Sequence, residues 1–335
     1  MPAAGRRSGL LAHGNDQAST GILLVSSPLC WISGVFQYLW TLVHGQIRVL
    51  VPVSDPVSIL ASIDKFKITS WLTAPPVLFT VGSEYENKYK NHYDISSLKT
   101  IFLGGSSTGA DVHTAMEEVF GCKIIQFYGS TETGGVFGSG SKIVPPGALG
   151  TLLSDVELRL VNIDTGEDIP ANVKNAVGEV RVRSKNLMLG YYKNPEATSE
   201  AFDEHGFFKT GDLAYEDEDG YFYFVDRIKE MIKYMNYQVA TAEVEAVLLQ
   251  HPGVRDACVV GRASPAHGEL PTAFVSRADN EAGEALTEAE LQAMVAEQLT
   301  DYKRLRGGVF FLDELPTMEM GKIARRSLKE MLKKL

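Results

Sequence analysis

The segment best suited to chemistry is a polar, glycine-rich stretch, residues 128–135, with the sequence Tyr-Gly-Ser-Thr-Glu-Thr-Gly-Gly. An apolar run, residues 123–127, precedes it and no hydrophobic period follows, so we expect a loop at the carboxyl end of a strand. Ligands bind at that end of an open α/β sheet. Tyr128 offers a ring for stacking, Thr131 a hydroxyl and Glu132 a carboxylate suited to Mg²⁺. Taken alone, the stretch is equally compatible with a solvated polar loop.

Three further segments combine charged and small residues. They are Lys-Thr-Gly-Asp-Leu at 209–213, Asp-Arg-Ile-Lys-Glu-Met-Ile-Lys at 226–233, and Pro-Thr-Met-Glu-Met-Gly-Lys-Ile at 316–323. With Tyr-Gly-Ser-Thr-Glu-Thr, they resemble in type and order the motifs of adenylate-forming enzymes, the family of acyl-CoA synthetases, coumarate-CoA ligases and beetle luciferases. The resemblance extends from about residue 20 to the end, and points in particular to the insect luciferase-like branch. One motif would be weak evidence, whereas four in the family's order are specific.

The resemblance implies a reaction in two steps. A small-molecule carboxylate, a fatty or aromatic acid, attacks the α-phosphate of ATP and releases pyrophosphate, and coenzyme A then captures the acyl-adenylate as a thioester. A carboxylate is already a competent nucleophile, so the protein has to neutralise charge and position the reactants. The expected cofactors are therefore ATP or AMP, Mg²⁺ and CoA.

The resemblance also assigns roles to residues around the nucleotide. The adenine is expected to lie against a wall of three small residues, Gly104, Gly105 and Ser106. Tyr128 should stack on the adenine, and Gly129 belongs to the same nucleotide-binding segment. Thr131 should touch a phosphate, and Glu132 should hold Mg²⁺. Both are also assigned to catalysis.

Four charged residues from the later motifs complete the implied site. Asp212 should accept hydrogen bonds from both ribose hydroxyls, as a carboxylate can, and Arg227 should reach the ribose from a hinge. Lys322 should neutralise phosphate charge during adenylation, and Lys233 should replace it in thioester formation after the small domain rotates. The alternatives are an ordinary surface ion pair and solvated lysines, and the motif order favours the functional interpretation.

The sequence departs from the family's pattern upstream. The family's Ser/Thr/Gly-rich phosphate loop ending in Pro-Lys-Gly has no match, since the run Ser-Thr-Gly at 19–21 is short and lacks the lysine. We therefore expect a long amino-terminal segment of the family to be missing. The aromatic motif near the acyl pocket should fall at residues 30–34, where Cys30-Trp31 stands in place of the family's histidine pair.

Three interpretations stay open. The first is an ATP-dependent acyl-CoA synthetase, or a truncated descendant of one. The second is a luciferase-like monooxygenase, although the changed pocket around Trp31 and Ser33 favours an acyl chain over luciferin. The third is a catalytically dead paralogue or an incomplete gene model that lacks the phosphate loop.

Composition limits the class of partner. The 335-residue chain carries a net charge of −10, so no basic surface for nucleic acid is expected. Residues 18–47 contain no Asp, Glu, Lys or Arg, but polar residues and a proline interrupt them. A buried strand at 22–25 and a buried helix at 31–43 therefore fit better than a transmembrane span.

Three widely spaced cysteines, Cys30, Cys122 and Cys258, are expected to be reduced and mostly buried in an intracellular protein.

The pattern of elements predicts an α/β fold. Strand and helix alternate between residues 21 and about 143, which is typical of a doubly wound α/β lobe with parallel strands. Strand-like runs without long helices follow and predict a β-barrel-like subdomain. We expect a partial AMP-binding amino-terminal domain over 21–226, a small α+β carboxyl-terminal domain over 227–335, and disorder in residues 1–20.

The last three residues, Lys333-Lys334-Leu335, resemble a degenerate form of the peroxisomal address Ser-Lys-Leu. The expected location is thus the peroxisome, through an import receptor, or else the cytoplasm. The same residues also fit the basic end of an amphipathic helix over 327–335, where lysines complement the helix dipole.

Overall fold

The computed structural model describes residues 21–51, 55–106, 108–139, 144–235, 237–318 and 322–334. These residues form two compact units. The first contains the described chain up to Thr210 together with Ala214–Phe224, and the second contains Gly211–Leu213 and the chain from Val225. The division therefore falls at Phe224, close to the boundary expected after residue 226.

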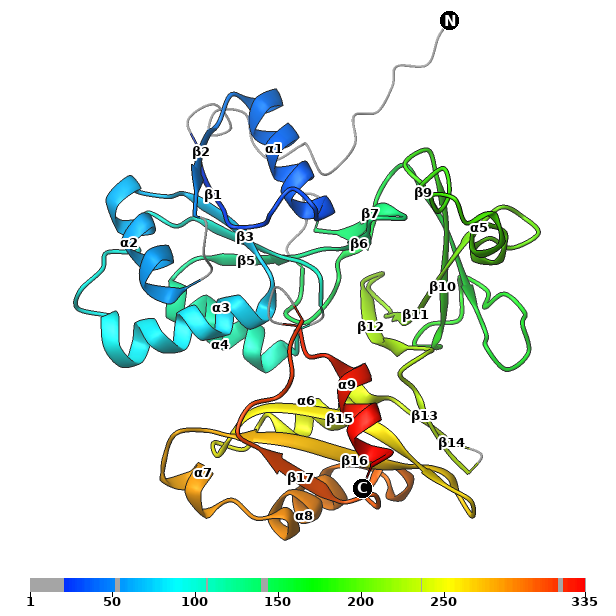
Figure 1. The fold of residues 1–335 in the computed structure, drawn as a ribbon. Helices are drawn as coiled ribbons and strands as arrows, with labels where there is room; N and C mark the ends of the chain where they lie inside the picture. The colour runs from blue at the N-terminus through cyan, green and yellow to red at the C-terminus, as the bar shows by residue number, and fades with distance from the viewer. Residues whose placement is uncertain are drawn as a thin grey trace, which may run out of the picture. The chain divides into compact units, whose positions relative to one another are not determined.

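A five-stranded parallel sheet forms the centre of the first unit, in the order β2-β1-β3-β4-β5. The strands are β1 (Ile22–Val25), β2 (Ile47–Leu50), β3 (Ser70–Thr73), β4 (Thr100–Leu103) and β5 (Lys123–Gln126). The helices between them are α1 (Ile32–His44), α2 (Pro56–Phe66), α3 (Pro75–Glu84), continued by a π-helical turn Tyr85–Tyr89, and α4 (Ala110–Phe120). Helix α1 lies on one side of the sheet and α2, α3 and α4 lie on the other (Figure 1). The doubly wound α/β lobe is confirmed.

Local sequence signals set the helix ends of this lobe. The Asp55 carboxylate accepts a hydrogen bond from the Ser58 N–H at 2.9 Å, and Pro56 opens the first turn of α2. Gly121 ends α4 with φ of 60°, a left-handed conformation that favours glycine. Trp71 and Leu78 are fully buried in the core that α2, α3 and α4 form with the sheet.

A helix follows the first strand as predicted, but the prediction that this helix is buried is wrong. Helix α1 forms, but Leu42 and Val43 are 56% and 79% exposed. The residues that α1 buries are small or polar: Gly34, Gln37 and Thr41. Composition predicted burial because the segment is apolar, yet the described chain covers only one side of this helix. Cys30, expected among buried cysteines, is also exposed, whereas Cys258 is buried and all three thiols are free.

Antiparallel sheets follow in the chain. One has the order β6-β7-β8 and the other β12-β11-β10-β9. Their strands are β6 (Tyr128–Ser130), β7 (Gly134–Gly138), β8 (Thr151–Leu152), β9 (Val156–Val161), β10 (Gly178–Ser184), β11 (Phe208–Glu216) and β12 (Phe222–Arg227). A short helix, α5 (Pro195–Ala201), lies between β10 and β11 in the chain. The β-rich region expected there is present, arranged as these two sheets.

The second unit builds its sheet from five strands in the order β14-β13-β16-β15, with β17 paired to β16. The strands are β13 (Ile232–Tyr234), β14 (Tyr237–Val239), β15 (Val254–Ser264), β16 (Gly268–Arg277) and β17 (Val309–Leu312). The helices are α6 (Thr241–Leu248), α7 (Glu281–Ala285), α8 (Glu288–Gln298), a 3₁₀ turn Asp301–Lys303, and α9 (Arg325–Leu332). Apolar residues of α6 and α8 share one core with the sheet, and Leu328 and Leu332 of α9 share another. This is the small α+β domain expected.

Two helix starts in this unit are held by different contacts. The N-cap of α6 is Ala240, and the backbone N–H and hydroxyl of Thr241 both donate to the buried Asp226 carboxylate. Thr287 caps α8 by accepting a hydrogen bond from the Glu290 N–H. The capping box is only half formed, because the Glu290 carboxylate pairs with His251 at 3.2 Å.

The carboxyl-terminal helix α9 ends at Leu332, with Lys333 as its C-cap, so it stops short of the predicted residue 335. Lys333 and Lys334 are exposed, and Leu335 lies outside the described residues. Among the described residues, no helix is both long and apolar enough to cross a membrane.

Candidate functional site

The segment 128–135 is a β-hairpin and not the open loop that its glycines suggested. Strands β6 and β7 pair antiparallel around the turn Thr131–Thr133. The buried Thr133 hydroxyl accepts a hydrogen bond from the Ser130 N–H at 3.0 Å and donates to the Gly134 carbonyl. The hairpin follows the carboxyl end of β5 directly, as expected, and its tip presents the exposed Thr131.

Two glycines of the predicted site allow close packing around this hairpin. A Cβ atom on Gly129 would lie 2.1 Å from the Gly134 carbonyl oxygen across the ladder. A Cβ atom on Gly104, which follows β4, would lie 2.6 Å from the Phe127 ring. The segment after β4 is thereby held against the start of the hairpin. The neighbouring Gly105 adopts φ of 92°, and both Gly105 and Ser106 are exposed.

A tyrosine that the motif search missed contacts the predicted metal ligand. The Tyr191 hydroxyl donates to Glu132 Oε1 at 3.2 Å, and the Met188 N–H donates to the Glu132 carbonyl at 2.8 Å. Burial, and then the Glu132 carboxylate, raise the pKa of Tyr191, so its hydroxyl stays protonated as a donor. Tyr191 lies 59 residues from Glu132, so no local spacing could have revealed the pair.

Glu132 fits the part that Mg²⁺ would need from the protein. Mg²⁺ is usually held by one or two carboxylates together with substrate phosphates and water. Within the described residues, no group of three or more His, Cys, Asp and Glu side chains could hold a metal by itself. A single carboxylate oriented by a tyrosine matches the first arrangement and not a metal cage made only of protein.

A second set of predicted residues meets in the second unit. Arg227 Nε lies 3.1 Å from Asp212 Oδ1, and the two residues stand on β12 and β11. Asp212 is buried, whereas the Arg227 side chain is 61% exposed. The Ile228 N–H donates to the Gly211 carbonyl at 2.8 Å, and the Asp226 carboxylate accepts from the Arg227 N–H at 2.7 Å. Strand β11, which was not predicted as a strand, thus positions Asp212.

Lys322 is electrostatically coupled to this pair. An isolated β-bridge pairs Thr317 with Ile323, on either side of Lys322 in the sequence. The Lys322 carbonyl accepts a hydrogen bond from the Met318 N–H at 2.7 Å. Burial, followed by the charge of Arg227, lowers the pKa of Lys322, while Asp212 acts in the opposite direction. Charged residues from three motifs, up to 110 positions apart in the sequence, are therefore close enough for two of them to affect the pKa of the third.

Lys233 occupies a different place in the same unit. It is exposed on β13, opposite Gln238 of β14, and its backbone N–H donates to Glu269 Oε2 at 2.9 Å. These contacts hold the backbone of Lys233 in place, while its exposed side chain keeps the ammonium group in solvent.

The lowered pKa of Lys322 predicts a pH effect. In the role that the resemblance assigns to Lys322, only the protonated amine can neutralise phosphate, so the alkaline limb of adenylation is expected at lower pH than an ordinary lysine would give. Lys322→Arg should extend adenylation to higher pH, since a guanidinium stays charged, although its different geometry should lower the maximal rate. Pyrophosphate release across a pH series measures both effects, and an unchanged alkaline limb in Lys322→Arg would exclude the lysine as its source.

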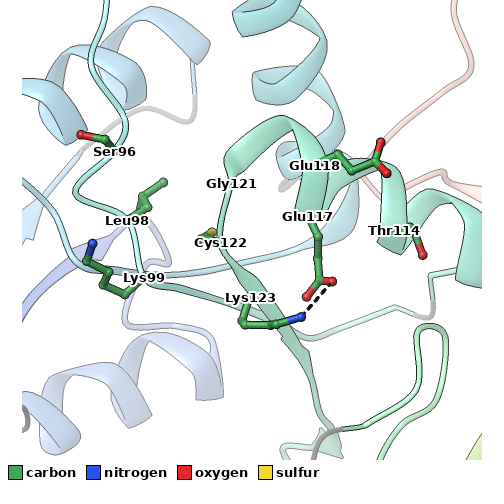
Figure 2. Close-up of a pocket in the computed structure, with 9 residues that line it drawn as sticks. All are labelled: Ser96, Leu98, Lys99, Thr114, Glu117, Glu118, Gly121, Cys122 and Lys123. Carbon is green, nitrogen blue, oxygen red and sulfur yellow. Dashed lines mark hydrogen bonds and ion pairs between the residues drawn. The ribbon is translucent and has the colours of Figure 1, made fainter.

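A separate hollow opens at the other end of the parallel strands (Figure 2). Lys99 precedes β4 and Lys123 begins β5, whereas Gly104 and Phe127 follow their carboxyl ends. In this hollow the Lys123 ammonium lies 3.5 Å from Glu117. None of the predicted site residues lines it. The two ends of one sheet are therefore chemically distinct, and only the carboxyl end carries the motif.

The predicted residues thus form two sets, one in each unit. Within the first unit the structure places Gly104 beside the base of the hairpin that carries Tyr128, Thr131 and Glu132. Within the second unit it joins Asp212, Arg227 and Lys322. The meeting of both sets at one nucleotide stays a prediction.

Comparisons with known proteins agree with this division. The AMP-binding enzyme family matches residues 7–192, and the AMP-binding enzyme C-terminal domain matches residues 243–322. A protein named probable 4-coumarate–CoA ligase 3, from Dictyostelium discoideum, is 37% identical over 89% of this chain and 53% of its own length. A luciferin 4-monooxygenase from Nipponoluciola cruciata is 39% identical over 96% of this chain and 58% of its own length.

A solved structure extends the likeness to the fold. The ATP-bound MatB from Rhodopseudomonas palustris superposes with a TM-score of 0.85 at 26% identity, covering 94% of this chain and 61% of that one. The fold is that of adenylate-forming enzymes. The chain belongs to the AMP-binding enzyme family. It spans little more than half the length of the two curated relatives.

Proposed function

We propose that this chain provides the nucleotide-handling part of an ATP-dependent ligase that adenylates a carboxylate and passes the acyl group to coenzyme A. The observation that carries the proposal is the grouping of Asp212, Arg227 and Lys322. Asp212 and Arg227 offer an acceptor and a donor for a ribose, and Lys322 offers a positive charge for the phosphate. An ordinary surface ion pair would not include a half-buried lysine from a third motif.

The first unit would supply the adenine and metal side of the same reaction. The exposed Gly105 and Ser106 after β4 would lie against a flat base, and Tyr128 would offer its ring. Glu132, oriented by Tyr191, would hold Mg²⁺ against the phosphates, where the ion neutralises charge. Thr131 at the hairpin tip would donate to a phosphate oxygen.

The acyl substrate class and the fate of the adenylate are further parts of the proposal. A fatty or aromatic acid with capture by CoA is the first candidate, supported by the coumarate-CoA ligase relative. Oxygenation of the adenylate is the second, supported by the luciferin 4-monooxygenase relative. Assays for a CoA-dependent thioester and for light emission with the same acids separate the two.

Nucleotide binding is the direct test. AMP should bind to the purified chain, and ATP should bind no more than a few-fold tighter, because this sequence contains the residues proposed to contact the nucleoside but no match to the lysine-containing phosphate loop. Asp212→Ala should weaken AMP binding about tenfold or more, since it removes a charged acceptor. Calorimetry measures these affinities.

The exposed Asp219 provides a matched control. Asp219→Ala should bind AMP like the unmodified chain. Equal weakening in both variants, or no binding of either nucleotide by the folded unmodified chain, would contradict the proposal. ATP binding far tighter than AMP binding would instead reveal contacts with the triphosphate that the motifs do not account for.

A further inference from the structure

Glu132 is held through both its backbone and its side chain by a segment that precedes α5. The Met188 N–H donates to the Glu132 carbonyl at 2.8 Å, and the Tyr191 hydroxyl donates to Glu132 Oε1 at 3.2 Å. We call residues 188–191 the Tyr191 segment. Its two hydrogen bonds fix both the position of Glu132 and the direction in which its carboxylate points.

The Tyr191 segment is in turn anchored to the start of α5. The Tyr191 N–H donates to the Thr198 hydroxyl at 2.9 Å, and that hydroxyl donates to the Asn194 carbonyl at 2.8 Å. The Asn194 N–H donates to the Tyr191 carbonyl at 3.1 Å. A Cβ atom on Gly190, which has φ of 148°, would lie 2.9 Å from Thr198 Cγ2, so the segment packs closely on the helix. The backbone of Tyr191 is thus held at both its N–H and its carbonyl, which limits where its hydroxyl can reach.

The hydroxyl makes the two carboxylate oxygens of Glu132 unequal. Oε1 accepts from Tyr191, whereas Oε2 has no hydrogen-bond or ion-pair partner in the described part of the chain. A cation that approaches Oε1 meets the hydroxyl hydrogen, which carries partial positive charge. Binding of one ion by both oxygens is therefore disfavoured, and Glu132 is arranged to offer a single oxygen.

A carboxylate that offers one oxygen suits Mg²⁺ better than Ca²⁺. Mg²⁺ keeps several waters and needs only one or two carboxylates beside the substrate phosphates. Ca²⁺ accepts more oxygen ligands in a more flexible geometry, and often takes both oxygens of one carboxylate. Among the described residues, no group of three or more His, Cys, Asp and Glu side chains offers additional ligands. The arrangement at Glu132 therefore favours the ion that needs fewer protein oxygens.

We propose that Tyr191 is a positioning residue that makes Glu132 a one-oxygen ligand and thereby selects Mg²⁺ over Ca²⁺ as the ion bound with ATP. This inference rests on the proposed function, in which Glu132 holds Mg²⁺ against the phosphates, and it adds the residue that determines which ion is held. Loss of the hydroxyl would leave the carboxylate less well oriented, which acts against Mg²⁺. It would also open Oε1 to a cation, which acts in favour of Ca²⁺.

The test measures how much each ion strengthens ATP binding. Calorimetry gives the Kd of ATP for the 335-residue chain in EDTA, in saturating Mg²⁺ and in saturating Ca²⁺. The gain for an ion is the Kd in EDTA divided by the Kd with that ion, and by linkage it equals the preference of the ion for bound over free ATP. We expect a gain of about tenfold for Mg²⁺ and a smaller gain for Ca²⁺.

Two substitutions change these gains in different ways. Tyr191→Phe should lower the Mg²⁺ gain about tenfold and should not lower the Ca²⁺ gain, so the ratio of the Mg²⁺ gain to the Ca²⁺ gain should fall about tenfold or more. Glu132→Gln should remove both gains, and adding Tyr191→Phe to it should have no further effect. A role of Tyr191 in packing alone would change the Kd by the same factor in all three solutions and leave both gains intact. A Mg²⁺ gain that survives Glu132→Gln would place the ion on another ligand and overturn the proposal.

The neighbouring tyrosine provides a matched control. Tyr192 is 88% exposed, so Tyr192→Phe removes a hydroxyl next to Tyr191 in the chain and should keep the ratio of gains of the unmodified chain. Thermal unfolding verifies that each variant is folded. The proposal is wrong if Tyr191→Phe leaves the ratio unchanged, if Tyr192→Phe lowers it equally, or if the unmodified chain shows no Mg²⁺ gain.

AMP binding in EDTA separates this inference from the proposed function. That measurement involves neither a metal ion nor a triphosphate. AMP binding together with an unchanged ratio of gains in Tyr191→Phe overturns the role of Tyr191 alone. A folded chain that binds neither AMP nor ATP contradicts the proposed function, and this inference with it.

Discussion

Replacing Arg325 with leucine should lower the free energy of unfolding of the second unit by about 3–5 kcal/mol, the usual cost of breaking a buried ion pair from one side. Arg325 of α9 forms a two-pronged pair with Glu245 of α6, at 2.6 Å and 2.7 Å. It also donates to the Val259 carbonyl of β15 at 2.9 Å. One guanidinium thus ties two helices and a central strand together.

The cost arises mainly from the group that is left behind. The Glu245 side chain is 12% exposed, and burial raises its pKa even though Arg325 opposes the shift. Without the guanidinium, the buried carboxylate keeps the bond from the Val259 N–H, at 2.6 Å, but loses the cation that balances its charge. The double replacement Glu245→Leu, Arg325→Leu should therefore lose less stability than Arg325→Leu alone.

Denaturant unfolding followed by fluorescence measures these differences. Arg304 provides the control, because its pair with Asp301 is exposed on both sides and joins neighbouring turns. Arg304→Leu should change stability by about 1 kcal/mol or less. If Arg304→Leu and Arg325→Leu cost the same, the buried pair does not stabilise this unit in the way its geometry indicates.

Local signals in the sequence were sufficient for the parallel lobe. The Asp-Pro start of α2 and the glycine after α4 depend only on neighbouring residues, and both mark helix ends in the structure. Alternation of strand and helix then leaves few possible topologies. Motif order likewise identified Asp212, Arg227 and Lys322, which the structure joins.

The failures concern contacts that composition cannot assign. The apolar sequence of α1 predicted burial, but composition does not say which of its residues pack against the rest of the unit, and in the described chain these are Gly34, Gln37 and Thr41. The glycines of segment 128–135 suggested a loop because glycine disfavours strands, while here Gly129 permits the close cross-strand approach of a hairpin. Tyr191 was missed because its contact with Glu132 depends on tertiary structure alone.

Lys322→Ala should slow adenylate formation by about 10²–10³-fold, the usual loss when one positioned group that stabilises developing charge is removed. The charges of Arg227 and Asp212, the predicted ribose contacts, both act on the pKa of this lysine, so we expect its charge to face the phosphate of a bound nucleotide. Lys233 is exposed on β13 and is assigned to the second half-reaction. Lys233→Ala should therefore leave adenylation nearly unchanged and slow thioester formation.

Separate assays distinguish the two lysines. Pyrophosphate release with a carboxylate and ATP reports the first half-reaction, and thioester formation from a preformed acyl-adenylate and CoA reports the second. Both assays use the purified 335-residue chain. Lys333→Ala is the control, because Lys333 belongs to neither motif and pairs with the exposed Glu330 at 2.7 Å. Equal loss of both half-reactions in Lys322→Ala would assign this lysine to nucleotide binding in general, since a group that acts only on the phosphate during adenylation cannot slow a reaction that starts from the finished adenylate.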